Sequence, residues 1–228
     1  MDYLLTSLGA ALSMIINLNH DVESAVWTSL YTSLVAIVIA ALIGIPIGAA
    51  IALGRFPGRR LLTTLLNTLM ALPTVVVGLV LFGLFSRQGP LGPLGLLFTP
   101  WAMIVGQVVL ATPIVANYAL AAVAGADPRI LPTAMTLGAG RLRGTWLLIQ
   151  EIRFGMMAAI VAGFGRVISE VGVAMMLGGN IRGTTRTMTT AIALETSKGE
   201  FAFGLALGLV LMSVALIINL FLNLLQED

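Results

Sequence analysis

The chain has 228 residues, of which 12 are basic and 10 are acidic, so charged side chains make up 10% of it and apolar ones 58%. An average soluble domain carries roughly a quarter charged residues, so this chain is too apolar to cover a soluble surface. Intrinsic disorder and nucleic-acid binding are also excluded, because the hydrophobicity is high and the net charge of +2 comes without a basic cluster. The composition therefore predicts a membrane protein with several spans.

Residues 1–22 are predicted to form an N-terminal helix that lies in the membrane interface. Apolar side chains such as Leu4, Leu8, Leu12 and Ile15 form one stripe along it, and polar side chains mark another face. The alternative is a further membrane span. The segment lacks the basic start of a secretory signal.

Residues 23–225 are predicted to form one all-α transmembrane domain with five spans. A span needs about 20 residues with few or no charges, and the charge-free segments are Ser24–Gly54, Leu61–Ser86, Gln88–Ala126 and Phe201–Gln226. The third segment opens with a Pro- and Gly-rich loop, so its helix is expected to begin near Trp101. Trp27 and Trp101 are typical of anchors at the membrane surface.

The remaining span, Phe154–Gly178, is apolar except for Arg166 and Glu170. These two residues are four apart, so they share a helical face and can pair. Charged side chains at membrane depth usually face the bundle interior or a water-filled path. We therefore interpret them as an intramembrane pair that fixes helix packing, with a charged gate as the alternative.

Three prolines, Pro46, Pro73 and Pro113, fall within the first three predicted spans. Proline removes a backbone donor and bends a helix, which membrane proteins tolerate where neighbours or water satisfy the freed groups. The pattern favours bent helices around a pathway over simple packing irregularity.

The basic residues of the short loops predict which way the chain crosses the membrane. The loops expected on the cytoplasmic side are richer in arginine than the opposite loops. The cytoplasmic set is Arg55, Arg59, Arg60, Arg129, Arg141, Arg143 and Arg153, and the external set is Arg87, Arg182, Arg186 and Lys198. This orientation places the N-terminus outside and the C-terminus in the cytoplasm of a multi-pass cell-membrane (inner or plasma membrane) protein.

Enzymatic chemistry on this chain is not expected. The chain has no Cys and one His, which excludes thiol chemistry and makes a zinc site improbable, so no metal site is predicted. The only lysine, Lys198, stands in Ser-Lys-Gly, so there is no P-loop. ATP hydrolysis would need another subunit.

The cytoplasmic segment 127–153 is the most informative. Asp127-Pro128 is typical of a helix start, and Leu131-Pro-Thr can begin a second short helix. Ala134 and Gly138 lie one turn apart, which permits close approach of a partner, although an ordinary loop is an equally good interpretation of the spacing alone.

The stretch from Pro132 to Ile149 resembles the cytoplasmic "EAA" loop of permease subunits in type I ABC importers. Ala134, Gly138, Ala139 and Leu148 match that motif, whereas Pro132 stands where Glu is usual. The resemblance implies that this loop docks into a cytoplasmic ATPase dimer, with Arg141 and Arg143 flanking the contact.

Two further stretches narrow the resemblance. Gly163–Gly172 is similar to a run in sulfate and molybdate permeases, and Gly178–Phe201 is most like the tungstate-importer permease. The resemblance implies the type I importer permease fold, a homodimer of permeases, an extracytoplasmic oxyanion-binding protein, and ATP and Mg²⁺ on the partner ATPase only.

The segment Gly183–Thr190 would face the anion from outside. Hydroxyl groups and positive charge suit a tetrahedral dianion, which predicts an anion path or outer gate. The residues expected there are Arg182, Thr184, Thr185, Arg186 and Thr187. The alternative is a plug that never touches the anion.

The leading expectation is thus the permease of a tungstate importer. Molybdate or sulfate is the alternative cargo, and a stand-alone anion channel, a secondary carrier or a membrane anchor is the alternative class.

Overall fold

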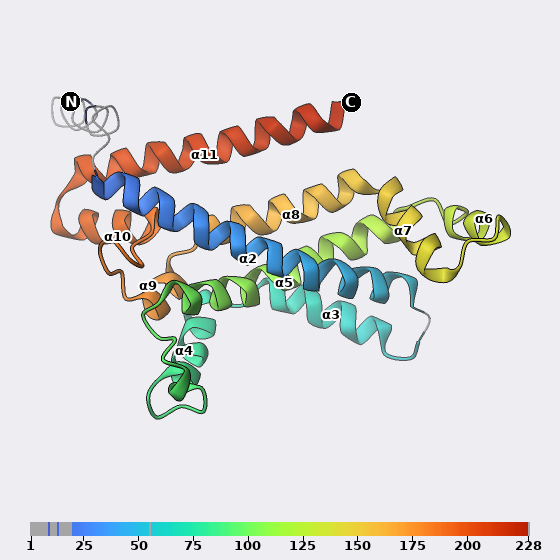
Figure 1. Cartoon of the computed structure of the whole chain (residues 1–228), viewed down its shortest axis with the longest axis horizontal. Helices are drawn as coiled ribbons and strands as arrows, with labels where there is room; N and C mark the ends of the chain where they lie inside the picture. The colour runs from blue at the N-terminus through green and yellow to red at the C-terminus, as the bar shows by residue number, and fades with distance from the viewer. Residues whose placement is uncertain (1–8, 10–12, 14–19, 55, 228) are drawn as a thin grey trace.

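The computed structural model describes residues 9, 13, 20–54 and 56–227, and its regular elements within these residues are helical. The long helices lie side by side along the length of the molecule (Figure 1). The elements are α2 (His20–Leu53), α3 (Arg59–Met70), α4 (Thr74–Phe85), η1 (Gly92–Leu94), α5 (Pro100–Ala124), α6 (Ile130–Thr136), α7 (Arg141–Glu151), α8 (Arg153–Ile168), α9 (Gly172–Gly178), α10 (Met188–Lys198) and α11 (Phe201–Glu227).

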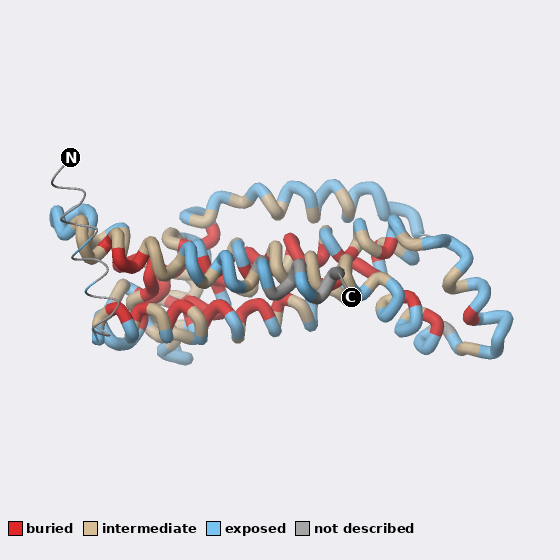
Figure 2. The backbone as a smooth tube through the Cα atoms, turned by 90° about the horizontal axis from the view of Figure 1, so that it is seen from above, coloured by how far each residue is buried: buried red, intermediate tan, exposed pale blue. Residues whose placement is uncertain are grey.

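Helices α2 and α5 form the centre of the bundle and together hold about half of the described buried residues (Figure 2). Small residues recur every four positions along α2, at Ala36, Ala40, Gly44 and Gly48, which lets the two backbones approach closely. A Cβ placed on Gly48 would lie 2.2 Å from the Ala116 carbonyl oxygen, so only glycine fits there.

The second predicted span is broken. The structure replaces one helix over Leu61–Ser86 by α3 and α4, which meet at an angle of 94°. Pro73 explains the break, because it has no backbone N–H to donate and its ring disfavours a helical conformation for Leu72. Pro46 and Pro113, in contrast, lie inside the unbroken α2 and α5.

The predicted helix over Phe154–Gly178 is also not continuous, which corrects the sequence-based expectation. Helix α8 ends at Ile168, and α9 begins at Gly172. The Ser169 hydroxyl donates to the Gly165 carbonyl at 2.8 Å, and Glu170 turns its carboxylate toward the start of α9. The Glu170 carboxylate thereby satisfies a backbone N–H in the first turn of α9, which has no partner within that helix.

Helices α2, α5 and the Phe201–Ile218 part of α11 are long and apolar enough to cross a membrane. The number rises to five when each of two bent pairs is one span: α3 with α4, and Leu142–Glu151 with α8. The expected all-α architecture is confirmed, with three to five candidate spans, but the fifth candidate joins part of α7 to α8 and differs from the predicted span over residues 154–178. Trp27 and Trp101 are exposed near the starts of α2 and α5, as membrane-surface anchors require.

The interfacial helix predicted for residues 1–22 lies almost wholly outside the described residues. Within the described chain, α2 already begins at His20, slightly before the predicted boundary of its span at Ser24.

Candidate functional site

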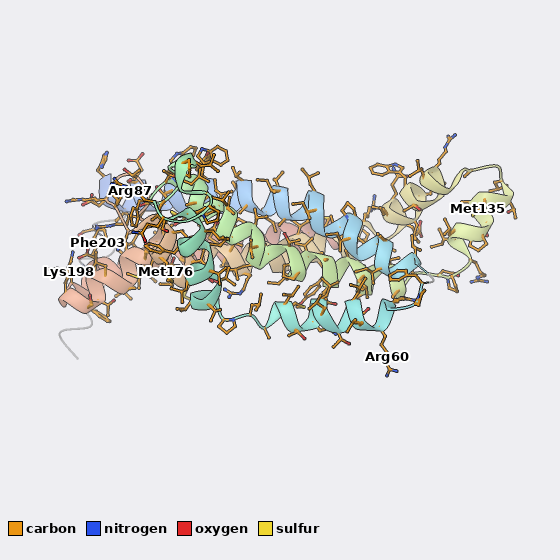
Figure 3. The ribbon with its side chains drawn as sticks, turned by 90° about the horizontal axis from the view of Figure 1, so that it is seen from below. Arg60, Arg87, Met135, Met176, Lys198 and Phe203 are labelled. Carbon is orange, nitrogen blue, oxygen red and sulfur yellow. The ribbon has the colours of Figure 1, made fainter. Side chains whose placement is uncertain are left out.

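The predicted functional residues fall at the two ends of the bundle. The α6–α7 end carries the segment 127–153, and Met135 projects there (Figure 3). The α9–α10 end carries the Thr- and Arg-rich segment and the Arg166–Glu170 pair.

At the α6–α7 end, one short helix replaces the two that the sequence predicted before Gly138. Asp127 does not start a helix: its carboxylate closes a turn by accepting a hydrogen bond from the Arg129 backbone N–H at 2.9 Å. Hydrogen bonds from the Arg129 side chain and backbone hold the pKa of the Asp127 carboxyl below its ordinary value. Helix α6 then begins at Ile130 with Pro132 in its first turn, where a missing N–H costs nothing.

The turn between α6 and α7 depends on Gly138, whose φ of 88° lies in the left-handed region. The Ala139 N–H donates to the Ala134 carbonyl at 3.0 Å and the Gly138 N–H to the Met135 carbonyl at 3.1 Å, which closes the end of α6. Gly138 is thus required by the backbone as well as by any partner.

Ala134 does not present its side chain to solvent. It is buried, and a Cβ on Gly144 of α7 would lie 3.9 Å from it, so Ala134 holds α6 against α7. Large apolar side chains project around the turn instead. Leu137 is 83% exposed and Leu142 90% exposed, with Met135 beside them. Arg143 is exposed, and Arg141 is the first residue of α7.

The Arg166–Glu170 pair is formed. Arg166 Nη1 lies 2.6 Å from Glu170 Oε2, and Glu170 is 3% exposed. Glu170 Oε1 also accepts a hydrogen bond from the Val173 backbone N–H at 3.1 Å, so the carboxylate caps α9. The pair is therefore part of the helix break.

The two helix breaks lie against each other. A Cβ on Gly172, at the start of α9, would lie 2.8 Å from Thr74 Oγ1, at the start of α4. Helix α10 contacts the break between α8 and α9, because Thr189 Oγ1 donates a hydrogen bond to the Glu170 carbonyl at 2.7 Å. Thr189 and Thr74 were not predicted as part of this site, because the residues that they meet are distant along the chain.

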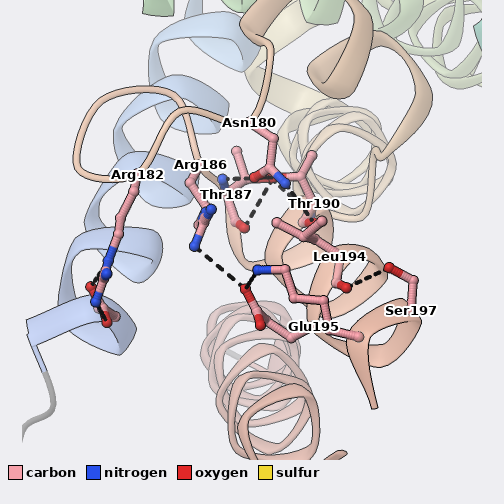
Figure 4. Close-up of polar contacts among 10 residues, drawn as sticks. Asn180, Arg182, Arg186, Thr187, Thr190, Leu194, Glu195 and Ser197 are labelled. Atoms are coloured by element: carbon pink, nitrogen blue, oxygen red, sulfur yellow. Dashed lines mark hydrogen bonds and ion pairs between the residues drawn. The ribbon is translucent and has the colours of Figure 1, made fainter. Parts of the chain in front are cut away.

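Most of the predicted anion-path hydroxyls are engaged within the chain (Figure 4). Thr185 Oγ1 donates to the Gly178 carbonyl and accepts from the Ile181 N–H, and it is fully buried. Thr187 and Thr190 form a reciprocal capping box that starts α10. Thr190 Oγ1 also donates to Asn180 Oδ1 at 3.0 Å. Thr184, in contrast, is exposed.

The cations of this segment are paired. Arg182 forms two hydrogen bonds with Asp21 of α2, and these raise the pKa of Arg182 above its ordinary value. Arg186 Nη1 lies 3.6 Å from Glu195 Oε1, while Arg186 Nε is buried and has no hydrogen-bond partner among the described residues. Lys198 Nζ lies 3.0 Å from the same Glu195 oxygen.

A cavity of about 370 Å³ opens among these charges. Its positive side chains are matched by negative ones, so it offers no net positive charge to a dianion. The lining residues are Asp21, Arg182, Arg186, Glu195, Lys198, Glu200 and Phe203. Among the residues that the structure describes, no group of three or more His, Cys, Asp or Glu is placed to hold a metal ion.

Residues 44–228 match the family described as "Binding-protein-dependent transport system inner membrane component". The chain is 41% identical over 219 residues to the tungstate uptake system permease protein TupB of Campylobacter jejuni, covering 96% of this chain and 92% of the relative. It is 37% identical to TupB of Peptoclostridium acidaminophilum over the whole of both chains.

The molybdenum transport system permease ModB of Escherichia coli is 31% identical over 71% of this chain and 73% of its own length. Among solved structures, the inward-facing MetNI methionine ABC transporter has a similar fold, with a TM-score of 0.75 and 17% identity over 92% of this chain and 96% of that one.

Proposed function

The chain belongs to the family of binding-protein-dependent transport system inner membrane components, and on that basis we propose that it is the permease of an ABC importer that carries tungstate into the cell. Near full-length similarity to two tungstate uptake permeases, at 41% and 37% identity, supports tungstate as the transported anion. Molybdate is the second candidate, supported by the lower and shorter similarity to ModB.

The chain is the transport subunit and not the ATPase. We infer that ATP and Mg²⁺ bind a separate ATPase dimer, that two copies of this permease pair, and that an extracytoplasmic binding protein delivers the anion. The family's printed description, which makes transport dependent on a binding protein, supports the last of these.

We propose that the α6–α7 end is cytoplasmic and the α9–α10 end external, with the N-terminus outside and the C-terminus inside. Arginines support this orientation, because Arg59, Arg129, Arg143 and Arg153 gather at the α6–α7 end.

The ATPase contact is best supported at the exposed apolar turn of the α6–α7 end. Met135, Leu137 and Leu142 can insert into a partner's groove, while Ala134, Gly138 and Ala139 hold the turn that presents them. Leu137→Asp should reduce co-purification of the ATPase and substrate-stimulated ATP hydrolysis, since a charge would be buried in the contact. The matched control is Leu94→Asp, at an exposed leucine at the other end of the bundle. Equal co-purification of both variants would contradict this contact.

We infer that the external segment acts as an outer gate and does not hold the anion directly. The engaged threonine hydroxyls and the paired arginines support a self-contained plug. Arg186→Gln should then leave the half-saturating anion concentration unchanged, whereas a rise of several-fold would support anion contact instead.

Uptake assays test the cargo. The permease, its ATPase and its binding protein are reconstituted in vesicles, and uptake of labelled tungstate is measured against competing tungstate, molybdate and sulfate. Tungstate should compete most strongly, and uptake should stop without the ATPase. Stronger competition by molybdate would change the cargo, and uptake without the ATPase would indicate a channel or secondary carrier.

A further inference from the structure

Helix α3 carries two unlike faces, although α3 and α4 together are long and apolar enough to cross a membrane. None of its residues is buried. One side bears exposed leucines, at Leu61, Leu62 and Leu65. The side that we call the α3 polar face carries Arg60, Thr63, Thr64, Asn67 and Thr68, at the three- and four-residue spacing of a single helical stripe.

Such a helix cannot face lipid on every side. Leucines suit hydrocarbon, but an exposed row of hydroxyl and amide groups at membrane depth needs water or a polar partner. Helix α3 runs antiparallel beside the second half of α5 (Figure 1), so α5 covers a third side and reaches the α3 polar face at Asn67. Arg60, Thr64 and Thr68 remain exposed.

The threonines of this face satisfy their own donors. Thr63, Thr64 and Thr68 each donate to the carbonyl four residues earlier, at 3.1, 2.9 and 2.9 Å. Their oxygens remain able to accept hydrogen bonds from water. This arrangement suits a face that lines a water-filled path better than a site that binds an anion tightly.

Asn67 differs from the threonines, because its amide is oriented by a residue of another helix. Asn117 Nδ2, on α5, donates to Asn67 Oδ1 and lies 2.8 Å from Met70 Sδ. The Asn67 oxygen is thereby occupied, and its Nδ2 donors have no partner among the described residues. Neutral N–H donors held in place suit a transient contact with an anion.

Arg60 lies two helical turns from Asn67, about 10 Å along the axis. Its side chain points away from the bundle at the α6–α7 end of α3 (Figure 3). A positive charge there would attract an anion that has passed Asn67.

We propose that the α3 polar face lines the water-filled path of the oxyanion, that Asn67 Nδ2 contacts the anion, and that Asn117 is a positioning residue for Asn67. This inference rests on the proposed function, since it takes the oxyanion as the cargo. It places the anion contact on α3, away from the segment around Arg186.

The natural absence of cysteine makes the path directly testable. Thr64→Cys and Thr68→Cys probe the α3 polar face, and Leu61→Cys and Leu65→Cys probe the leucine side. Each variant is reconstituted in vesicles with its ATPase and binding protein and treated with a negatively charged methanethiosulfonate reagent. The threonine-derived cysteines should react at least ten-fold faster than the leucine-derived ones, and tungstate during turnover should slow their labelling.

Equal labelling on both sides would overturn the path. Unreactive cysteines at positions 64 and 68 that instead cross-link two copies would also overturn it, because the face would then be a dry dimer seam. The difference in labelling between the two sides is independent of the cargo. That difference, combined with uptake of molybdate and not tungstate, would sustain the path and overturn the proposed function.

Uptake kinetics test the two asparagines. Asn67→Ala should raise the half-saturating concentration of the transported anion several-fold. Asn117→Ala should have a similar effect in the wild-type background and little further effect in Asn67→Ala. Leu65→Ala is the control on the opposite side. Additive effects of the two asparagine variants, or a loss of maximal rate alone, would contradict the positioning role.

Discussion

Removal of the Glu170 carboxylate tests whether the break between α8 and α9 is held by charge. Glu170→Ala deletes the 2.6 Å ion pair to Arg166 and the hydrogen bond from the Val173 N–H. Breaking a buried pair costs about 3–5 kcal/mol, because a charge is left buried. The Arg166 side chain is 33% exposed, so its unpaired charge stays partly hydrated in the variant. We therefore take about 2 kcal/mol as the loss of unfolding free energy when the pair is removed. Loss of the cap adds about 1 kcal/mol.

The sum, about 3 kcal/mol, corresponds to a fall in the melting temperature of about 6–12 °C for a chain of this size. Glu170→Gln keeps an oxygen for the Val173 N–H, so it should lose only the pair, about 2 kcal/mol. The double variant Arg166→Met with Glu170→Gln strands no charge and should recover most of that loss.

The assay is thermal unfolding of the purified permease in detergent, followed by tryptophan fluorescence at one fixed heating rate because membrane proteins often unfold irreversibly. A melting temperature of Glu170→Ala within about 2 °C of wild type would refute the expected loss of about 3 kcal/mol and with it the structural role of the pair. If that stable variant also leaked anions from vesicles, the pair would be a charged gate.

Three other substitutions have expected outcomes. Gly48→Ala places a Cβ 2.2 Å from the Ala116 carbonyl and should lower stability by about 1–3 kcal/mol, whereas Gly208→Ala, with no atom within 4 Å of its Cβ, should not lower the melting temperature. Thr189→Val removes the hydrogen bond to the Glu170 carbonyl and should cost about 1 kcal/mol, with no change if α10 is not fastened there. Arg182→Gln removes an exposed pair with Asp21 and should leave the melting temperature almost unchanged, and a clear fall would show that this pair fastens the segment to α2.

The positions of charges were enough to predict the spans but not their breaks. Pro73 marked the first break in the sequence, because proline removes a backbone donor. The second break had no such marker. There the Glu170 carboxylate caps α9, and only the folded chain brings Thr189 to the Glu170 carbonyl.

The candidate site shows a similar limit. A run of threonines beside arginines is typical of an anion-binding segment, but the Gly178 carbonyl and Asn180 occupy the hydroxyls of Thr185 and Thr190. The polar face of α3 could have been predicted from the spacing of Thr64, Asn67 and Thr68. The spans were predicted from charge-free segments, and this criterion does not separate hydroxyl and amide side chains from apolar ones. The polar stripe of α3 was therefore not predicted.

The close contact between α2 and α5 also determines which movements are open to the molecule. A one-residue slide of α2 would bring Ile47 or Ala49 to the place where Gly48 meets the Ala116 carbonyl, and a Cβ does not fit there. A slide between the two helices by one residue is therefore blocked, and we expect α2 and α5 to move together as one unit. We expect bending to occur most easily at the interruptions at Pro73 and Glu170, where the helical hydrogen-bond ladder is broken.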